Sequence, residues 1–157
     1  MKNSAKGNMY EVALDEAWDL FAAHLGGARA ELVCVVSQEP LDERARAALN
    51  SSVDALGYGR DGCTFISLQA DDGSLLDDQA LFLLVEGLDP SCLIACDQVA
   101  ATALGKAFRC ELPLMKQSRV FGRTAVAFRN FTAMLDDGQD KQVAWALLKK
   151  LPKFGRR

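Results

Sequence analysis

Two clusters of charged side chains are the residues whose types and spacing could do chemistry in this chain. The first cluster is acidic and consists of Asp71, Asp72, Asp77 and Asp78. Carboxylates at these positions could bind a divalent cation, but they lack the regular spacing of a cation-binding loop. Acidic residues are also typical of the first turn of a helix, where they face its positive end. We therefore interpret the cluster as the solvated start of a helix and predict no metal site.

The second cluster is basic and lies at the C-terminus. Its members are Lys149, Lys150, Lys153, Arg156 and Arg157. Cations in this pattern could bind phosphate groups of a nucleic acid. They also complement the negative end of a helix, so both interpretations stay open. Five further cations precede the cluster and would strengthen the first interpretation if they shared its face: Arg109, Lys116, Arg119, Arg123 and Arg129.

Histidine and cysteine are the remaining candidates for catalysis or metal binding. The single histidine, His24, lies in a helical pattern, and we expect its ring to pack with one nitrogen hydrogen-bonded. Cys34, Cys92 and Cys96 lie in apolar stretches, where reduced cysteine behaves as a small hydrophobe. Cys63 and Cys110 are expected to be more exposed. An odd number of cysteines in a chain of this kind predicts free thiols and no disulfide framework.

The stretch Leu83–Leu104 indicates which edge of the fold would hold a ligand. Its sequence predicts the end of a helix, a turn at Asp89-Pro90, a buried strand Cys92–Cys96 and a new helix that Asp97 caps. In open α/β sheets, ligands bind beyond the carboxyl ends of the strands, which here means Cys96-Asp97-Gln98.

The rest of the chain repeats this alternation of helix and strand. Helices are predicted over Tyr10–Leu25, Leu41–Leu56, Leu75–Leu88, Asp97–Phe108 and Asp140–Leu151, with Gly26-Gly27 ending the first. Further strands are predicted over Glu31–Ser37 and Cys63–Leu68. Arg119–Phe121 and Thr124–Phe128 are read either as a hairpin turned at Gly122-Arg123 or as a loop and one buried strand. Arg129–Leu135 is expected to be a connecting turn.

Alternation of this kind predicts an α/β fold, a three-layer α/β/α sandwich around a mostly parallel four-stranded sheet. We expect a disordered N-terminus over 1–9, a single domain over 10–151 and a basic tail over 152–157. The net charge of −3 gives no global attraction to nucleic acid or to an anionic membrane. With no signal peptide and no apolar span in the sequence, we expect a cytoplasmic protein.

Several motifs in this order resemble the uracil-DNA glycosylase superfamily, most nearly its family-4 bacterial type. They are VVSQEPL, the helix end VDALGY, the segment from Leu88-Asp89-Pro90 to Ala100-Ala101, VAFRNFTAML, and Lys141…Trp145…Leu148. The resemblance runs from about Glu31 to Leu151. The psi subunit of the bacterial clamp loader has a similar framework and serves as a binding protein, so the resemblance alone does not imply an activity.

The resemblance places the glycosylase chemistry in two loops. The first is Ser37-Gln38-Glu39-Pro40-Leu41, in which Pro40 matches the family but Ser37 and Leu41 replace its two glycines. Gln38 or Glu39 could orient a water molecule there, although we favour a polar turn that caps the next helix.

The second loop carries Asn130 at the position of the family's histidine, which donates a hydrogen bond to the developing negative charge on uracil. Phe131 replaces its proline. Arg129 could supply charge, and Phe128 or Phe131 could form a stacking surface for a base. The cysteine pairs that hold an iron–sulfur cluster in family-4 enzymes are missing, so no such cluster and no other cofactor is expected.

The expected function is therefore that of a glycosylase-like domain with a degenerate catalytic site, acting as a binding or interaction module. DNA or a replication or repair protein is the expected partner. The alternative is an active DNA glycosylase that uses Gln38 or Glu39 with Asn130. The binding residues expected in either case are Ser37, Pro40, Phe128, Arg129, Phe131, Lys149, Lys150 and Lys153.

Overall fold

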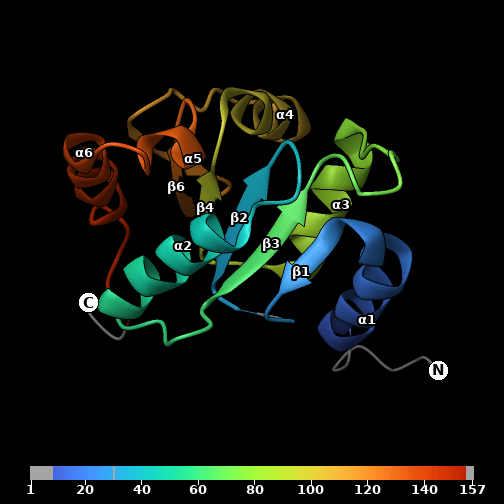
Figure 1. Ribbon diagram of the computed structural model, residues 1–157. Coiled ribbons are helices and arrows are strands. Elements are labelled where there is room, and N and C mark those ends of the chain that lie inside the picture. The colour runs from blue at the N-terminus through green and yellow to red at the C-terminus, as the bar shows by residue number, and fades with distance from the viewer. Residues whose placement is uncertain (1–8, 30, 155–157) are drawn as a thin grey trace.

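The computed structural model describes residues 9–29 and 31–154, in which helices cover both faces of one sheet (Figure 1). Six strands are hydrogen-bonded in the order β1-β3-β2-β4-β6-β5. The four inner strands are parallel, and each edge strand is antiparallel to its neighbour. The α/β class and the mostly parallel sheet are confirmed, whereas the predicted count of four strands is wrong.

The four parallel strands are the ones that the apolar runs predict. They are β2 (Val33–Ser37), β3 (Cys63–Ser67), β4 (Cys92–Ala95) and β6 (Arg123–Ala127). Every residue of these strands is buried. Continuous burial explains why the runs show no alternation of polar and apolar residues, since both faces of the strands are covered.

The strand missing from the sequence prediction at one edge is β1 (Leu25–Gly27), which pairs antiparallel with β3. We expected Gly26-Gly27 to end the preceding helix. A Cβ atom on Gly27, whose φ is +75°, would lie 2.6 Å from Cδ2 of Phe65. Glycine is therefore required for close approach to β3, and a strand of three residues with two glycines leaves no side-chain pattern to detect.

At the other edge, β5 (Gln117–Val120) and β6 form the hairpin that was one of the two alternatives. Its turn lies at Phe121-Gly122, one residue before the predicted position. Both turn residues have positive φ, 50° and 83°. Two successive positive φ angles are typical of the tight turns that match the twist of a hairpin.

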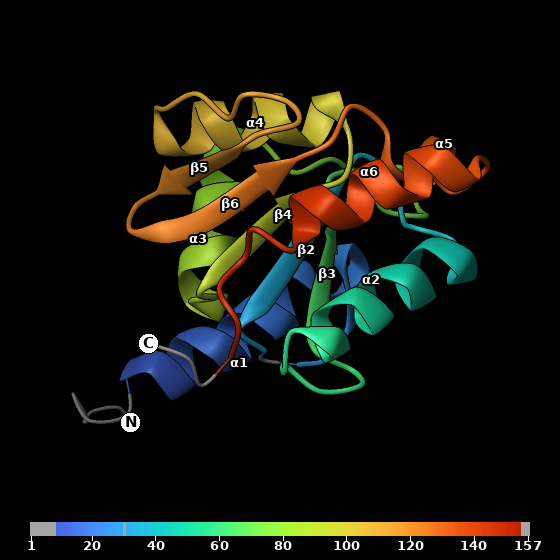
Figure 2. The ribbon, with the colours of Figure 1, turned by 90° about the vertical axis from the view of Figure 1, so that its left-hand side faces the viewer.

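The helices form the two outer layers (Figures 1 and 2). One face, here called the α3 face, carries α1 (Met9–Phe21), α3 (Asp78–Leu88) and α4 (Gln98–Phe108). The opposite α2 face carries α2 (Glu43–Ala55), the short α5 (Phe131–Met134) and α6 (Gly138–Leu148). A single 3-10 turn, η2 (Ala22–His24), joins α1 to β1. Arg129–Leu135, which we expected to be a connecting turn, contains the short helix α5.

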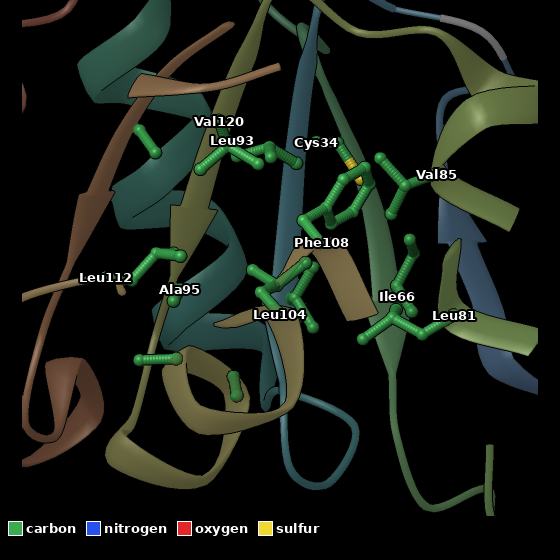
Figure 3. Packing of buried hydrophobic residues seen from close by; sticks show 14 of the residues in the cluster. Cys34, Ile66, Leu81, Val85, Leu93, Ala95, Leu104, Phe108, Leu112 and Val120 are labelled. Carbon is green, nitrogen blue, oxygen red and sulfur yellow. The ribbon is translucent and has the colours of Figure 1, made fainter. Parts of the chain in front are cut away.

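Each face of the sheet has its own hydrophobic core. On the α3 face, Leu81, Val85, Leu104 and Phe108 pack over strand residues such as Ile66 (Figure 3). The core of the α2 face combines Leu49 and Val53 of α2 with Leu147 and Leu148 of α6. Val143 of α6 faces away from this core and is 45% exposed.

The segment after α6 lies against the C-terminal end of α2. The hydroxyl of Tyr58 donates to the carbonyl oxygen of Pro152 at 2.6 Å, and the amide of Phe154 donates to that of Leu56 at 2.9 Å. The remaining tail residues 155–157 and the expected disordered residues 1–8 lie outside the described residues. No helix within the described ranges is long and apolar enough to span a bilayer.

Candidate functional site

Four parallel strands end at the same edge of the sheet, which we call the carboxyl edge. Their last residues are Ser37, Ser67, Ala95 and Ala127. The strand order reverses between β2 and β4, because the chain passes from β2 to β3 on one side and then to β4 on the other. Ligands of open α/β sheets bind at such a reversal. Both loops identified in the sequence follow strands that end here.

Asp97 lies at the reversal point and links the segments on its two sides by hydrogen bonds. One carboxylate oxygen, Oδ1, accepts from the amide of Ala100 at 2.8 Å and caps α4, as predicted. The other oxygen, Oδ2, accepts from the amide of Gln38 at 2.9 Å. Asp97 also forms an isolated β-bridge with Asn130. One side chain therefore connects the start of α4 to the first loop, and its backbone pairs with the second loop.

The first loop, Ser37–Leu41, is held by its own backbone. The buried hydroxyl of Ser37 donates to the carbonyl oxygen of Glu39 at 2.7 Å. The side chains of Gln38, Glu39 and Pro40 are exposed. Capping of α2 falls to Asp42, whose Oδ1 accepts from the amide of Ala45 at 2.8 Å. The loop is thus a polar turn before a capped helix, as we favoured, with the capping residue just beyond it.

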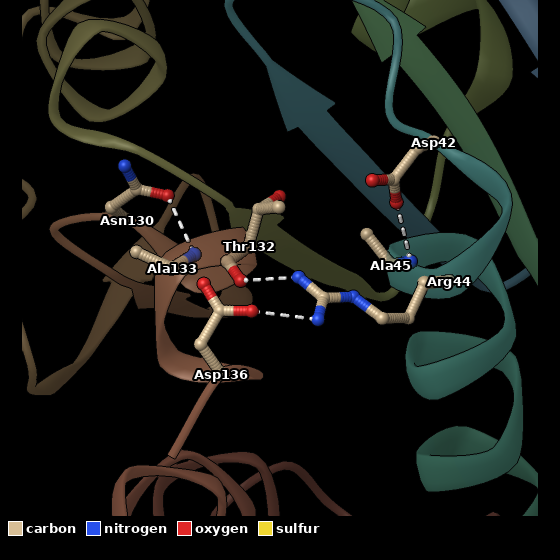
Figure 4. A network of polar contacts seen from close by, with 7 residues as sticks. All are labelled: Asp42, Arg44, Ala45, Asn130, Thr132, Ala133 and Asp136. Atoms are coloured by element: carbon tan, nitrogen blue, oxygen red, sulfur yellow. Dashed lines mark hydrogen bonds and ion pairs between the residues drawn. The ribbon is translucent and has the colours of Figure 1, made fainter.

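The second loop is also held in place by hydrogen bonds within the protein. Oδ1 of Asn130 accepts from the amide of Ala133 at 3.1 Å, which caps α5 (Figure 4). The amide of Phe131 donates to the carbonyl oxygen of Cys96 at 2.8 Å, tying the loop to the end of β4. Arg129 is exposed at the surface of this loop. The carbonyl group of Asn130 faces its own helix, while its amide group makes no hydrogen bond to a described residue.

An ion pair that the sequence did not predict joins α2 to α5. Nη1 of Arg44 lies 2.7 Å from Oδ1 of Asp136, and Nη2 donates to the carbonyl oxygen of Thr132 at 3.2 Å (Figure 4). The hydrogen bond to Asp136 raises the pKa of Arg44. The pair is exposed and separated by 92 residues in sequence, so only the tertiary structure could bring it together.

Phe128 and Phe131 do not form a stacking surface, and this prediction is wrong. Phe128 is fully buried and Phe131 is 2% exposed. Their ring centroids lie 5.1 Å apart, edge to face, within the core of the α2 face. Burial of a large aromatic side chain stabilises the fold most when its whole surface is removed from water. Both rings lie where α5 and α6 cover the sheet.

The cysteines are free thiols among hydrophobic residues. Cys34, Cys63, Cys92 and Cys96 are buried, and Cys110 is half-buried. The expectation that Cys63 is exposed is therefore wrong, since it lies inside β3. Burial raises the pKa of Cys63 to about 12 and also raises the pKa of Cys34 and of Cys96. Among the residues that the structure describes, no group of three or more potential ligands could hold a metal ion.

The acidic cluster around α3 is explained by local structure. Asp77 caps the helix by accepting from the amide of Ala80 at 2.8 Å, and Asp78 lies in the first turn. Oδ1 of Asp72 accepts from both the amide and the hydroxyl of Ser74, at 2.9 and 2.6 Å. These hydrogen bonds lower the pKa of Asp72. The interpretation as a solvated helix start agrees with this geometry.

Lys149, Lys150 and Lys153, here called the basic cluster, are all exposed. Lys149 lies over the ring of Trp145, with its Nζ 5.8 Å from the centroid. The side chain of Gln117 in β5 donates to the carbonyl oxygen of Lys150 at 3.1 Å, so β5 lies beside the cluster. The two remaining cations, Arg156 and Arg157, lie outside the described residues.

Arg123 does not share an exposed face with the basic cluster, so it does not strengthen the phosphate-binding interpretation. It is buried, and its guanidinium lies 2.8 Å from Oε2 of Glu86 and 3.0 Å from Oδ1 of Asp89. Its Nε donates to the carbonyl oxygen of Pro90 at 2.7 Å. Arg123 therefore joins β6 to the end of α3 on the edge of the sheet opposite the carboxyl edge.

A polar pocket that the sequence did not predict lies beside β1. It has a volume of about 90 Å³, and its lining includes His24, Ser37, Arg46, Ser67 and Asp71. His24 is buried, and its Nδ1 lies 2.8 Å from the carbonyl oxygen of Ser67, which confirms the packing expected for this ring. These residues come from separate segments of the chain, so no local motif could have revealed the pocket.

A comparison with models of known protein families found no matching family, and a comparison with curated proteins found no match.

Proposed function

We propose that this protein is a glycosylase-like α/β domain that acts by binding a partner and does not hydrolyse an N-glycosidic bond. The observation that carries the proposal is the set of internal hydrogen bonds at the carboxyl edge. Asp97 accepts from the amide of Gln38 and also caps α4, while Asn130 caps α5. A glycosylase needs the groups in these loops to face a base instead.

The other requirements for hydrolysis of an N-glycosidic bond are also poorly met. Negative charge that develops on a departing base must be stabilised by donors held in place beforehand. The polar groups that remain available in the two loops are Gln38, Glu39, Arg129 and the amide group of Asn130, and all four residues are exposed to water. Water weakens their electrostatic effect, because charges interact much less strongly at high dielectric constant. The aromatic rings expected to stack on a base are buried in the core.

A glycosylase assay tests this proposal directly. The protein is incubated with DNA duplexes that contain uracil, hypoxanthine or xanthine, and alkali then reveals abasic sites as strand breaks. We expect no breaks above the background of a heat-denatured control. Breaks that disappear in Glu39→Ala or Asn130→Ala would overturn the proposal and establish the alternative, an active glycosylase with a divergent site. That alternative is supported by the exposed Gln38 and Glu39, which could orient a water molecule, and by the amide group of Asn130, which makes no hydrogen bond to a described residue.

DNA, alone or with a replication or repair protein, is the partner that we propose. The supporting observation is the exposed basic cluster beside β5, where Lys116 and Arg119 are also exposed. Phosphate contacts of this kind depend on salt, since each one releases a counterion. We expect gel-shift affinity for duplex DNA to fall with salt concentration. Replacing Lys149, Lys150 and Lys153 with Gln should flatten this dependence, whereas Lys106→Gln, on α4 of the opposite face, should leave it unchanged.

An unchanged salt dependence in the triple variant would discard the basic cluster as a DNA contact. A pull-down with the wild-type chain as bait would then test the protein partner separately.

A further inference from the structure

The pocket beside β1 combines Ser37, Pro40 and Leu41 of the first loop with side chains from outside the two carboxyl-edge loops. It lies where α2 begins, next to the ends of β2 and β3 and against the edge strand β1. Its volume of about 90 Å³ exceeds the space of a single water molecule, which needs roughly 10–15 Å³ by the same kind of measure. The pocket can therefore hold a small polar ligand or several waters.

Arg46 supplies the main charge in this pocket. Its guanidinium stacks 5.0 Å from the ring centroid of Phe65, and its Nε donates to the carbonyl oxygen of Leu41 at 3.2 Å. Both Nη atoms would lie 3.0 Å and Cζ 3.4 Å from a Cβ atom at Gly26, so the glycine makes room for the Nη edge of the guanidinium. None of the ion pairs among the described residues involves Arg46. Its two Nη groups are held in place without a carboxylate partner.

Ser67 supplies a hydroxyl donor. The residue is only 6% exposed and lines the pocket, and its hydroxyl makes no hydrogen bond to a described residue. The hydroxyl oxygen is not among the polar atoms of the described residues that are closed off from water without a partner, so solvent or a ligand in the pocket can reach it. The backbone of Ser67 is fixed by its hydrogen bond with His24.

His24 is held on its other side as well. Its Nε2 lies 3.4 Å from the hydroxyl of Ser74, which donates to Oδ1 of Asp72 at 2.6 Å. The ring thus forms a rigid wall of the pocket, between Ser67 and the loop before α3. Its environment will report any ligand that enters.

We propose that this pocket binds a phosphate-sized oxyanion, either the free ion or the phosphate end of a larger ligand. An Nη group of Arg46 donates to one oxygen of the anion in a charge-assisted hydrogen bond. The hydroxyl of Ser67 donates to another oxygen.

Asp71 is the one carboxylate in the lining, and it opposes an anion. Its side chain is exposed, so water and salt screen the repulsion. The inference does not rest on the proposed function of the carboxyl edge, because none of Asp97, Asn130 and Glu39 lines this pocket.

Titration with inorganic phosphate tests the proposal, with sodium chloride holding the ionic strength constant. The chain has a single histidine, so one set of ring proton signals in the NMR spectrum reports on the pocket. We expect a saturable shift of these signals in wild type. Arg46→Ala should raise the apparent dissociation constant at least about tenfold, because it removes charge-assisted hydrogen bonds. Arg60→Ala, which removes the same charge from an exposed turn before β3, should change it less than about twofold.

Asp71→Asn should tighten binding by about twofold, a gain that damage to the fold cannot produce. A phosphate monoester such as ribose 5-phosphate distinguishes the two sources of the anion. Tighter binding of the ester assigns the pocket to a larger ligand, and tighter binding of the free ion assigns it to phosphate itself. A shift that does not saturate, or that Arg46→Ala and Arg60→Ala change equally, overturns the proposal. So does equal binding in Arg46→Ala and wild type.

Discussion

Arg123 and Arg44 each pair with carboxylates, but only Arg123 is buried, with a side chain 9% exposed against 51% for Arg44. We expect Arg123→Ala to lower the free energy of unfolding by about 2–4 kcal/mol, because it removes several charge-assisted hydrogen bonds from a buried position. Arg44→Ala should have a much smaller effect, since solvent screens an exposed pair. Urea denaturation of both variants measures the difference. Equal losses would mean that burial does not determine the strength of these pairs.

The cysteines allow a second prediction at the scale of single residues. Cys110 is half-buried, while the other four thiols are buried, so access to reagent differs sharply between them. We expect one of the five thiols to react with Ellman's reagent in the native protein and all five to react in denaturant. Cys110→Ser should abolish the reaction of the native protein. Reaction of a second native thiol would show that one of the strands opens.

At the scale of elements, aspartate is the residue that starts helices in this protein. The side chains of Asp42, Asp77, Asp97 and Asp137 cap α2, α3, α4 and α6. A carboxylate at this position accepts from an unpaired amide of the first turn and also faces the positive end of the helix. The sequence indicated the cap at Asp97, because the residue directly follows an apolar strand.

Asp97 and Asp77 both cap a helix, so comparing them tests how much the extra hydrogen bond of Asp97 at the carboxyl edge adds to the free energy of unfolding. We expect Asp77→Ala to lower the free energy of unfolding by about 1 kcal/mol, which is the usual value of a helix cap. Asp97→Ala should cost roughly 1 kcal/mol more, because it also removes the hydrogen bond to the amide of Gln38. Thermal and urea denaturation give both values. If the two variants lose the same stability, the link to Gln38 does not hold the loop.

At the scale of the whole molecule, the buried thiols make stability depend on alkaline pH. Burial holds the pKa of Cys63 at about 12 and raises that of Cys34 and Cys96, whereas an unfolded thiol titrates near 8.5. Above about pH 8.5 the unfolded chain therefore releases protons that the folded chain keeps. The thiols contribute fully below this pH, and their contribution is lost as the pH rises toward the folded pKa.

We accordingly expect the free energy of unfolding to fall above about pH 8.5, by up to about 1.4 kcal/mol per pH unit for each such thiol. Urea denaturation in a reducing buffer between pH 7.5 and 9.5 measures the slope. Cys34→Ala should reduce the slope, whatever its effect on stability at neutral pH. A slope that is unchanged in this variant would assign the alkaline loss to other groups.

The sequence predicted those elements whose burial leaves a continuous apolar pattern. The strands β2, β3 and β4 appear as unbroken hydrophobic runs, because helices cover both of their faces. The edge strand β1 escaped prediction, since two of its three residues are glycines. The hairpin β5–β6 stayed ambiguous because its outer strand is mostly exposed and short.

What the sequence alone determined is the α/β class, the parallel inner strands and the cap at Asp97, all of which depend on residues close together in the chain. Only the tertiary structure decided which polar side chains meet. It buried Phe128 and Phe131, paired Arg123 with Glu86 and Asp89, and gathered His24, Arg46 and Ser67 around one pocket. The physical reason is that local periodicity records whether a residue faces the core, whereas contacts between distant segments depend on strand order and on how helices pack.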